Sequence, residues 1–298
     1  MEYKEYLEQK DFSQSSIKSY KIVANRFNKW LKNKKLITSQ ITYNDITAYI
    51  NYLQSKSNKQ RTIQLEIGAL KHYLNYQKLI GNLTHLPINN IKIQGVKRQS
   101  IYNIFTPEEL DYIYQNYPSE DANKKGVEMI PKQKRNKIII GLLVYQGLNT
   151  TDLGNIKLEH LQLYKGTINI PATKRSNSRT LKLEAHQALD IQNFILEGRE
   201  YLLQKFNKRT DHLIFNLGIS NTITNMLYNL MKNLKQQHHE ITSAKQIRAS
   251  VITNWLKHHN LREVQYRAGH KFVSSTENYK IHDIETLQND IVQFSPNI

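Results

Sequence analysis

The sequence predicts a mainly α-helical protein with one small β-sheet, an α+β fold, divided between two domains. Apolar residues recur at helical spacing through the first ninety residues. A polar and basic stretch over residues 95–104 then interrupts the pattern, and the helical patterns beyond it are broken once by two short alternating segments. A chain of 298 residues is long enough for two domains with separate cores.

The first domain, expected over residues 1–94, is predicted to be a small basic bundle of helices. Apolar stripes with i, i+3 and i+4 spacing cover residues 17–31, 46–53 and 63–74. The serines at 13–16 are candidate N-caps ahead of the first stripe. Lys, Arg, Asn and Gln occupy the polar faces, which is typical of a surface that meets a polyanion.

The second domain, expected over residues 105–298, follows a linker at 95–104. A helix is predicted to begin at Thr106, with Pro107 at N1 and glutamate at N3. Residues 166–170 and 180–183 alternate as two short strands around a polar turn at 174–179. Helical patterns return at 185–196 and 223–234, and apolar residues at 281, 284, 287 and 291 predict a C-terminal helix over 281–292.

Composition excludes several functional classes and favours a nucleic-acid partner. Lys and Arg number 42 against 25 Asp and Glu, so the formal net charge is +17. Such an excess favours a polyanion, although a basic protein of unrelated function would show the same number. The longest apolar stretch, 138–144, is far shorter than the roughly 20 residues that cross a bilayer, and the N-terminus carries no signal core. We therefore expect a soluble, cytoplasmic protein with no membrane contact.

Metal and cofactor sites are not expected. The chain has no cysteine, which excludes disulfides and thiolate zinc sites. Histidines are paired at 238–239 and at 258–259, but no carboxylate stands near either pair at ligand spacing. Both pairs are interpreted as solvent-facing.

Four short stretches of the second domain form an ordered set. They are Gly147-Leu148-Asn149-Thr150-Thr151-Asp152-Leu153, Lys174-Arg175-Ser176-Asn177-Ser178-Arg179-Thr180, Lys245-Gln246-Ile247-Arg248, and Ala268-Gly269-His270 followed nine residues later by Tyr279. The set resembles the tyrosine recombinase (phage integrase) family, in which the corresponding motifs are Gly-Leu-Arg-x-x-Glu-Leu, Lys-Thr-Gly-Lys-Ser-Arg-Thr, His-x-x-Arg and Leu-Gly-His with a distal tyrosine. The segment 16–20 resembles the helical, SAM-like core-binding domain of the same family. The resemblance covers nearly the whole chain and is to the simple, two-domain, Xer-like members.

The resemblance implies a role for each residue, and the chemistry suits those roles. Tyr279 would attack the scissile phosphate and form a 3′-phosphotyrosine link, and Lys174 would protonate the leaving 5′-oxygen. Arg248 and His270 would hold the phosphate oxygens. Arginine offers a planar fork of donors for phosphate, and Lys245 stands one helical turn before Arg248, so both can meet the same phosphate. No cofactor is implied.

Two positions depart from the family pattern. Lys245 replaces the usual histidine and still donates to phosphate, whereas Asn149 stands where the first catalytic arginine is expected. Losing one preorganised donor from such a site costs about 2.7–4 kcal/mol. Three outcomes are open: a slow enzyme, a catalytically impaired accessory protein that only binds DNA, or an enzyme in which another cation substitutes. Candidate substitutes are Arg135, Lys157 and Arg175.

The resemblance also implies partners. Double-stranded DNA is the expected substrate, with a dimer of the protein on each site and a tetramer in synapsis, and an accessory DNA-bending protein is a further candidate partner. The C-terminal helix is expected to dock on a neighbouring subunit, although packing on its own domain would explain the same stripe. Integration or excision of a mobile element is the expected role. The alternatives are the impaired accessory protein and a basic helical protein that binds nucleic acid by charge alone.

Overall fold

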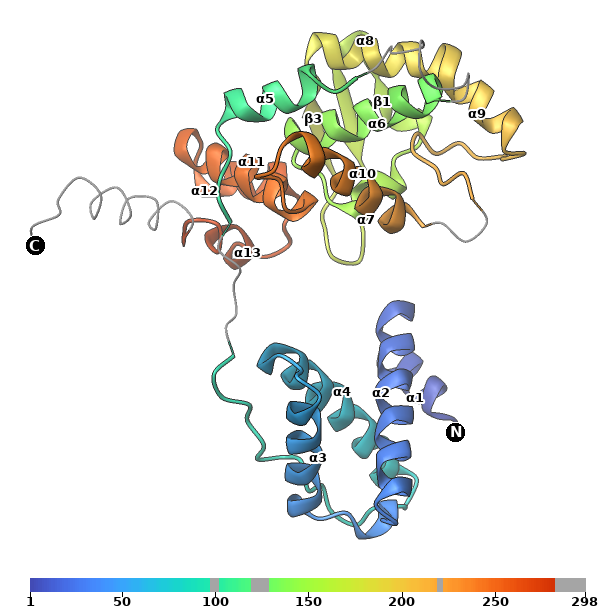
Figure 1. Cartoon of the computed structure of the whole chain (residues 1–298), viewed down its shortest axis with the longest axis vertical. Helices are drawn as coiled ribbons and strands as arrows, with labels where there is room; N and C mark the ends of the chain where they lie inside the picture. The colour runs from blue at the N-terminus through green and yellow to red at the C-terminus, as the bar shows by residue number, and fades with distance from the viewer. Residues whose placement is uncertain (97–101, 119–128, 219–221, 282–298) are drawn as a thin grey trace, which may run out of the picture. The chain divides into compact units, whose positions relative to one another are not determined.

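The computed structural model describes residues 1–96, 102–118, 129–218 and 222–281. Helices dominate these ranges and one small sheet accompanies them (Figure 1), so the predicted α+β class is confirmed. The chain divides into two compact units, Met1–Ser100 and Ile101–Ile298. In the part of the chain that is described, no helix is both long enough and apolar enough to span a membrane.

The N-terminal unit contains four α-helices around one core. They are α1 (Tyr3–Gln9), α2 (Gln14–Asn33), α3 (Tyr43–Ser55) and α4 (Gln60–Leu79), with the short 3₁₀ helix η1 (Thr38–Gln40) between α2 and α3. The Ser13 hydroxyl caps α2 by accepting a hydrogen bond from Ser16 N at 3.2 Å. The three predicted apolar stripes face the shared core through buried residues such as Phe27, Tyr49 and Leu70. The first helix, α1, carries no long stripe and was not predicted.

The C-terminal unit is built around the helix α6 (Met129–Val144). Its apolar run at 138–144 is buried, and it packs against α5 (Pro107–Gln115), α8 (Ala185–Asn193) and α11 (Ala244–His258), as Figure 1 shows. Thr106 caps α5 in the predicted capping box with Glu109. The run that is too short for a membrane span is therefore the buried centre of this unit.

Three antiparallel strands form the sheet in the order β1 (Leu161–Gln162), β2 (Thr167–Ile170), β3 (Arg179–Lys182). The predicted hairpin is β2 and β3, in which Ile168 pairs with Leu181 and Ile170 pairs with Arg179. Every second residue of β3 is buried, beginning with Arg179. The two ends of the hairpin loop at 171–178 are therefore held by the pairing of β2 with β3.

The remaining elements complete the C-terminal unit. They are α7 (Thr150–Asn155), η2 (Leu158–His160), η3 (Leu163–Lys165), the π-helical turn η4 (Phe194–Arg199), α9 (Glu200–Lys205), α10 (Ile223–Gln237), α12 (Leu261–Ala268) and α13 (Ser274–Glu277). The predicted patterns at 185–196 and 223–234 correspond to α8 with η4 and to α10. The C-terminal helix expected over 281–292 lies outside the described residues after 281, as do residues 97–101, half of the expected linker.

Candidate active site

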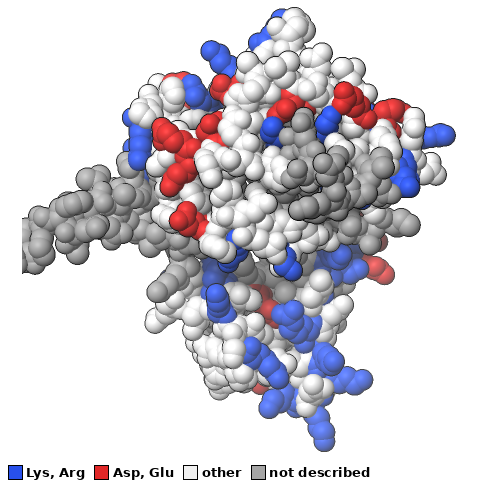
Figure 2. Space-filling view, turned by 45° about the horizontal axis from the view of Figure 1, so that its top comes forward, with Lys and Arg blue, Asp and Glu red and all other residues white. Residues whose placement is uncertain are grey.

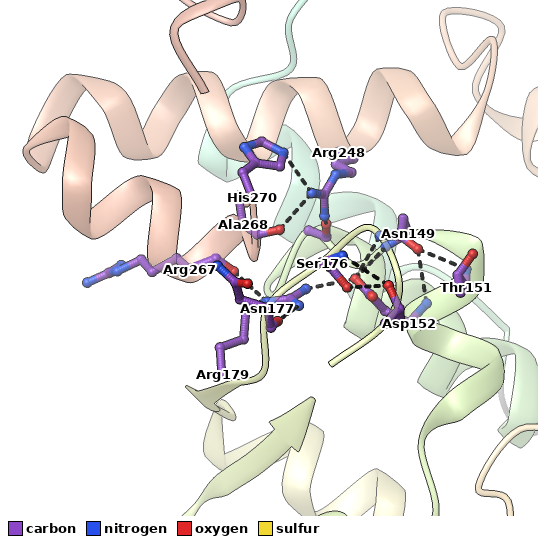
Figure 3. Close-up of polar contacts among 12 residues, drawn as sticks. Asn149, Thr151, Asp152, Ser176, Asn177, Arg179, Arg248, Arg267, Ala268 and His270 are labelled. Carbon is purple, nitrogen blue, oxygen red and sulfur yellow. Dashed lines mark hydrogen bonds and ion pairs between the residues drawn. The ribbon is translucent and has the colours of Figure 1, made fainter. Parts of the chain in front are cut away.

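The four sequence stretches come together in one place in the C-terminal unit (Figure 3). The first follows α6 and opens α7, and the second is the hairpin loop between β2 and β3. The third is the N-terminal part of α11, and the fourth is the turn between α12 and α13. Residues more than a hundred positions apart are thereby joined by direct hydrogen bonds.

Arg248 links three of these segments from a nearly buried position on α11. Its side chain donates from Nη1 to the Gly147 carbonyl and from Nη2 to the Ala268 carbonyl at 2.8 Å. A second Nη2 bond reaches His270 Nε2 at 3.1 Å. Since these bonds use three of the five N–H donors of the guanidinium, they fix its plane. The planar fork is thus held in one orientation.

His270 is held as a neutral imidazole. Arginine has no acceptor, so His270 Nε2 must accept the bond from Arg248. The proton then sits on Nδ1 and is donated to the Thr276 hydroxyl at 2.9 Å. Burial, with the nearby positive charges of Arg248 and Arg179, lowers the pKa of His270 to about 4. His270 is therefore uncharged at neutral pH.

Tyr279 lies directly against His270. Their rings stack with centroids 5.7 Å apart and planes 14° from parallel. The tyrosine ring also packs against the small apolar cluster of Ile252, Val264 and Ala268, which joins α11 to α12. The tyrosine is half-buried, and His270, which stacks on it, is hydrogen-bonded to Arg248.

The hairpin loop that carries Lys174 is docked on the turn that carries His270. Within the loop, Thr173 N donates to the Ser176 carbonyl at 2.9 Å, and Ser176 N donates to the Thr173 hydroxyl at 3.0 Å. Across to the turn, Asn177 N donates to the Gly269 carbonyl at 3.0 Å, and Ser176 forms an isolated antiparallel bridge with His270. Lys174 is exposed at the tip of this docked loop.

Lys245 occupies the exposed first turn of α11, one turn before Arg248. The predicted i, i+3 relation therefore holds along the helix. The two side chains differ in environment, since Arg248 is nearly buried while Lys245 is exposed to solvent.

Asn149 acts as the N-cap of α7. Its Oδ1 accepts hydrogen bonds from Thr151 N at 2.8 Å and from Asp152 N at 3.0 Å. Its Nδ2 donates to Asp152 Oδ2 at 2.9 Å. The side-chain amide thus caps the helix with its oxygen and donates to the buried carboxylate with its nitrogen.

Two of the three candidate substitute cations have partners elsewhere. Arg135 is buried and donates to the Phe215 carbonyl, and burial lowers its pKa to about 10. Lys157 is paired with Asp211 at 2.9 Å. Only Arg175 lies on a segment of the site, exposed beside Lys174 on the hairpin loop.

A buried ion pair that sequence reasoning did not single out lies beneath the site. Arg179 Nη2 contacts Asp152 Oδ2 at 2.7 Å, and both side chains are completely shielded from solvent. The signal was present in the alternation of β3, because Arg179 shares the inward face with Leu181. A carboxylate compensates the charge of a buried arginine, and Asp152 does so for Arg179.

One histidine of each pair contacts a neighbouring side chain. His259 forms a contact with Glu263 at 3.2 Å, and His238 packs edge-on against Tyr112. Within the described ranges, no three His, Asp or Glu side chains are grouped so that they could hold a metal ion.

Positive charge is concentrated in the N-terminal unit. Residues 1–100 hold seventeen Lys and Arg against six Asp and Glu, whereas residues 101–298 hold twenty-five against nineteen. Figure 2 shows Lys and Arg side chains over much of the visible surface of this unit, with few acidic side chains among them. Such a surface is suited to binding a polyanion through charge alone, and this binding does not depend on the catalytic residues, which lie in the C-terminal unit.

Comparisons with known proteins cover both units. The sequence pattern of the phage integrase family matches residues 103–285, and that of the N-terminal SAM-like domain of phage integrases matches residues 1–79. Tyrosine recombinase XerC of Staphylococcus epidermidis is 26% identical over 279 residues, which span 91% of this chain and 88% of that protein.

Solved structures share the fold. The XerH site-specific recombinase bound to a palindromic difH substrate, a post-cleavage complex, aligns with a TM-score of 0.70 at 18% identity, over 93% of this chain and 79% of that one. The Tn1549 transposon integrase in complex with transposon right end DNA aligns with a TM-score of 0.63 at 14% identity, over 98% of this chain and 99% of that one.

Proposed function

This chain belongs to the phage integrase family of tyrosine recombinases, and we propose that Tyr279 is the nucleophile with which it cuts and rejoins DNA at specific sites. The observation that carries the proposal is the contiguous group of Tyr279, His270 and Arg248. The tyrosine ring stacks on His270, and His270 is hydrogen-bonded to Arg248. The nucleophile is thus joined through His270 to a guanidinium of fixed orientation, and guanidinium is the donor group that suits phosphate.

The reaction follows from these positions. The Tyr279 phenol loses its proton to water, its Oη forms a bond to phosphorus, and the bond from phosphorus to the 5′-oxygen breaks. Lys174, exposed at the tip of the hairpin loop, supplies the proton to the leaving 5′-oxygen. The product is a 3′-phosphotyrosine link, and attack by a 5′-hydroxyl of another strand reverses the step without an external energy source.

Arg248, Lys245 and His270 stabilise the charge on the phosphate. Arg248 is preorganised by its three hydrogen bonds, so it does not have to reorient when charge develops on the non-bridging oxygens. Neutral His270 orients Arg248 through the hydrogen bond that its Nε2 accepts from the guanidinium. Lys245 adds a mobile positive charge from the helix terminus.

Double-stranded DNA is the partner, and the basic N-terminal unit holds it in place for the C-terminal unit. Exchange between two duplexes requires four strand cuts, and each protomer carries one Tyr279. Four protomers, two on each site, therefore make up the complete assembly. Integration or excision of a mobile element, carried out in the cytoplasm, is the setting that we propose.

A second candidate function is that of a DNA-binding accessory protein with an impaired active site. Asn149 favours it, because the side-chain amide at this position is engaged by α7 and Asp152. The two functions share the same fold and the same DNA, and differ only in whether a covalent adduct forms.

Covalent trapping separates them. The protein is incubated with nicked or phosphorothiolate-containing fragments of the DNA that flanks its own gene, and products are separated in SDS. The controls are Tyr279→Phe and Tyr228→Phe, a matched change at a 70% exposed tyrosine on α10. We expect an adduct with the unchanged protein and with Tyr228→Phe, and none with Tyr279→Phe. Sequence-specific binding with no adduct in any lane would establish the accessory protein instead.

A further inference from the structure

We propose that Arg179 is a positioning residue of this active site. It holds the hairpin loop of Lys174, the turn of His270 and the start of α7 in fixed positions relative to one another. The inference rests on the proposed function and adds to it a residue that never contacts DNA. Arg179 also supplies the cation for the buried carboxylate of Asp152, to which Asn149 offers only an amide.

The contacts of Arg179 reach all three segments. Its Nε donates to the Arg267 carbonyl at 2.8 Å, at the end of α12 and three residues before His270. Its Nη1 reaches the Asn177 carbonyl at 3.5 Å in the hairpin loop, and its Nη2 donates to Asp152 at 2.7 Å in α7. One rigid guanidinium therefore spans three segments that are separated widely in the sequence.

The turn of His270 is built directly on this guanidinium. Gly269 adopts a left-handed φ of 70°, and a Cβ added there would lie 2.7 Å from Arg179 Cζ and closer still to Nη1. The backbone next to His270 is thus in contact with the guanidinium face, with no room for a side chain between them. Because the Gly269 carbonyl also receives the Asn177 amide, the loop, the turn and Arg179 form one packed unit (Figure 3).

Charge explains why this arrangement matters when position 149 is asparagine. Asp152 is buried, and Asn149 offers it only an uncharged amide donor. A buried carboxylate without a cation is strongly destabilising, and Arg179 supplies that cation. Its charge also acts on His270, whose pKa it lowers together with burial and Arg248. Since its side chain is fully shielded, Arg179 acts through these neighbours and not on the phosphate.

The test compares Arg179→Met and Arg179→Lys with Arg199→Met. Arg199 is a matched control, because it is also a buried arginine of this unit that donates to backbone carbonyls, those of Thr210 and His212. Three quantities are measured on the full chain: DNA affinity, the single-turnover rate of adduct formation at saturating protein, and hydrogen exchange of the backbone amides at 176–177.

We expect DNA affinity to change little in all three variants. Adduct formation should slow about 100-fold in Arg179→Met, the loss that follows from a displacement of roughly 1 Å in a reacting group. Arg179→Lys keeps the positive charge but cannot make all three hydrogen bonds of the guanidinium. Its rate of adduct formation should therefore lie between those of Arg179→Met and the unchanged protein. Exchange at Asn177 should accelerate in both Arg179 variants and not in Arg199→Met.

Two results would overturn the inference. One is an Arg179→Met rate within a few fold of the Arg199→Met rate. The other is unchanged exchange at Asn177 in a folded Arg179 variant, and Arg179→Lys answers this question if the methionine variant does not fold. If the unchanged protein forms no adduct, the proposed function fails, whereas the exchange measurement still decides whether Arg179 holds the loop.

Discussion

Replacing Gly269 by alanine tests the packing of the His270 turn against Arg179. Two separate effects add at this position. The first is the left-handed backbone, which costs an alanine about 1–2 kcal/mol. The second is the collision of the new Cβ with a guanidinium that is buried on all sides, an overpacking that typically costs about 1–3 kcal/mol.

The two effects together should lower the free energy of unfolding by about 2–5 kcal/mol. A matched variant separates the backbone effect from the collision. Gly166 has a similar φ of 60°, but a Cβ there would meet only the Leu183 carbonyl at 3.7 Å, an ordinary contact. Gly166→Ala should therefore show the backbone effect alone, about 1–2 kcal/mol. For a domain of this size each kcal/mol corresponds to roughly 2–4 °C in Tm. Gly269→Ala should melt several degrees below Gly166→Ala.

Thermal unfolding followed by circular dichroism, with denaturant titration for the free energy of unfolding, measures both variants. The double change Gly269→Ala with Arg179→Met removes the obstructing guanidinium, so its loss of stability should be smaller than the sum of the two single losses. Equal melting temperatures for Gly269→Ala and Gly166→Ala would show that Arg179 does not pack beneath the turn, and the reasoning would be refuted.

Three further outcomes are expected. Asn149→Ala removes the N-cap of α7 and should lower the free energy of unfolding by about 0.5–2 kcal/mol, as measured by denaturant titration. Thr222→Ala, at the N-cap of α10, should cause a comparable loss. An unchanged free energy of unfolding in Asn149→Ala would contradict the capping role. Folding lowers the pKa of His270 from 6.5 to about 4, so the unfolded chain binds more protons than the folded chain between these two pH values. The stability that depends on neutral His270 is therefore present above pH 6.5 and is lost as the pH falls towards 4. His270→Gln should therefore flatten the fall in Tm over this range, and an unchanged slope would count against the neutral histidine. Lys174→Met should abolish most adduct formation at pH 7 without a change in Tm, because Lys174 is exposed, and substrates with a phosphorothiolate leaving group should restore cleavage.

The fold was largely predictable because its elements carry strong local signals. The stripes of α2, α3 and α4, the capping box of α5 and the alternation of β2 and β3 all appear in short windows of sequence. Helix α1 escaped prediction because seven residues hold too little periodicity. Helix α7 escaped for a similar reason, since its six residues are recognisable mainly from the cap that Asn149 provides.

The site was predictable only where a motif carries it. Arg248, His270 and Tyr279 follow from the ordered set of motifs, and the structure brings them together. The role of Asn149 could not be predicted, because it depends on which atoms its amide meets after folding. The pair of Arg179 with Asp152 spans 27 positions, and no local pattern couples residues at that separation.

The helix cap at position 149 also bears on the evolution of this protein. Arginine has no side-chain acceptor, so a mutation that restored the family's residue at 149 would end the capping of α7. It would at the same time bring a second guanidinium to a carboxylate that already has Arg179. A gain of arginine at position 149 is therefore coupled to the loss of a helix cap, so a change that adds a cation to the site also lowers the stability of α7.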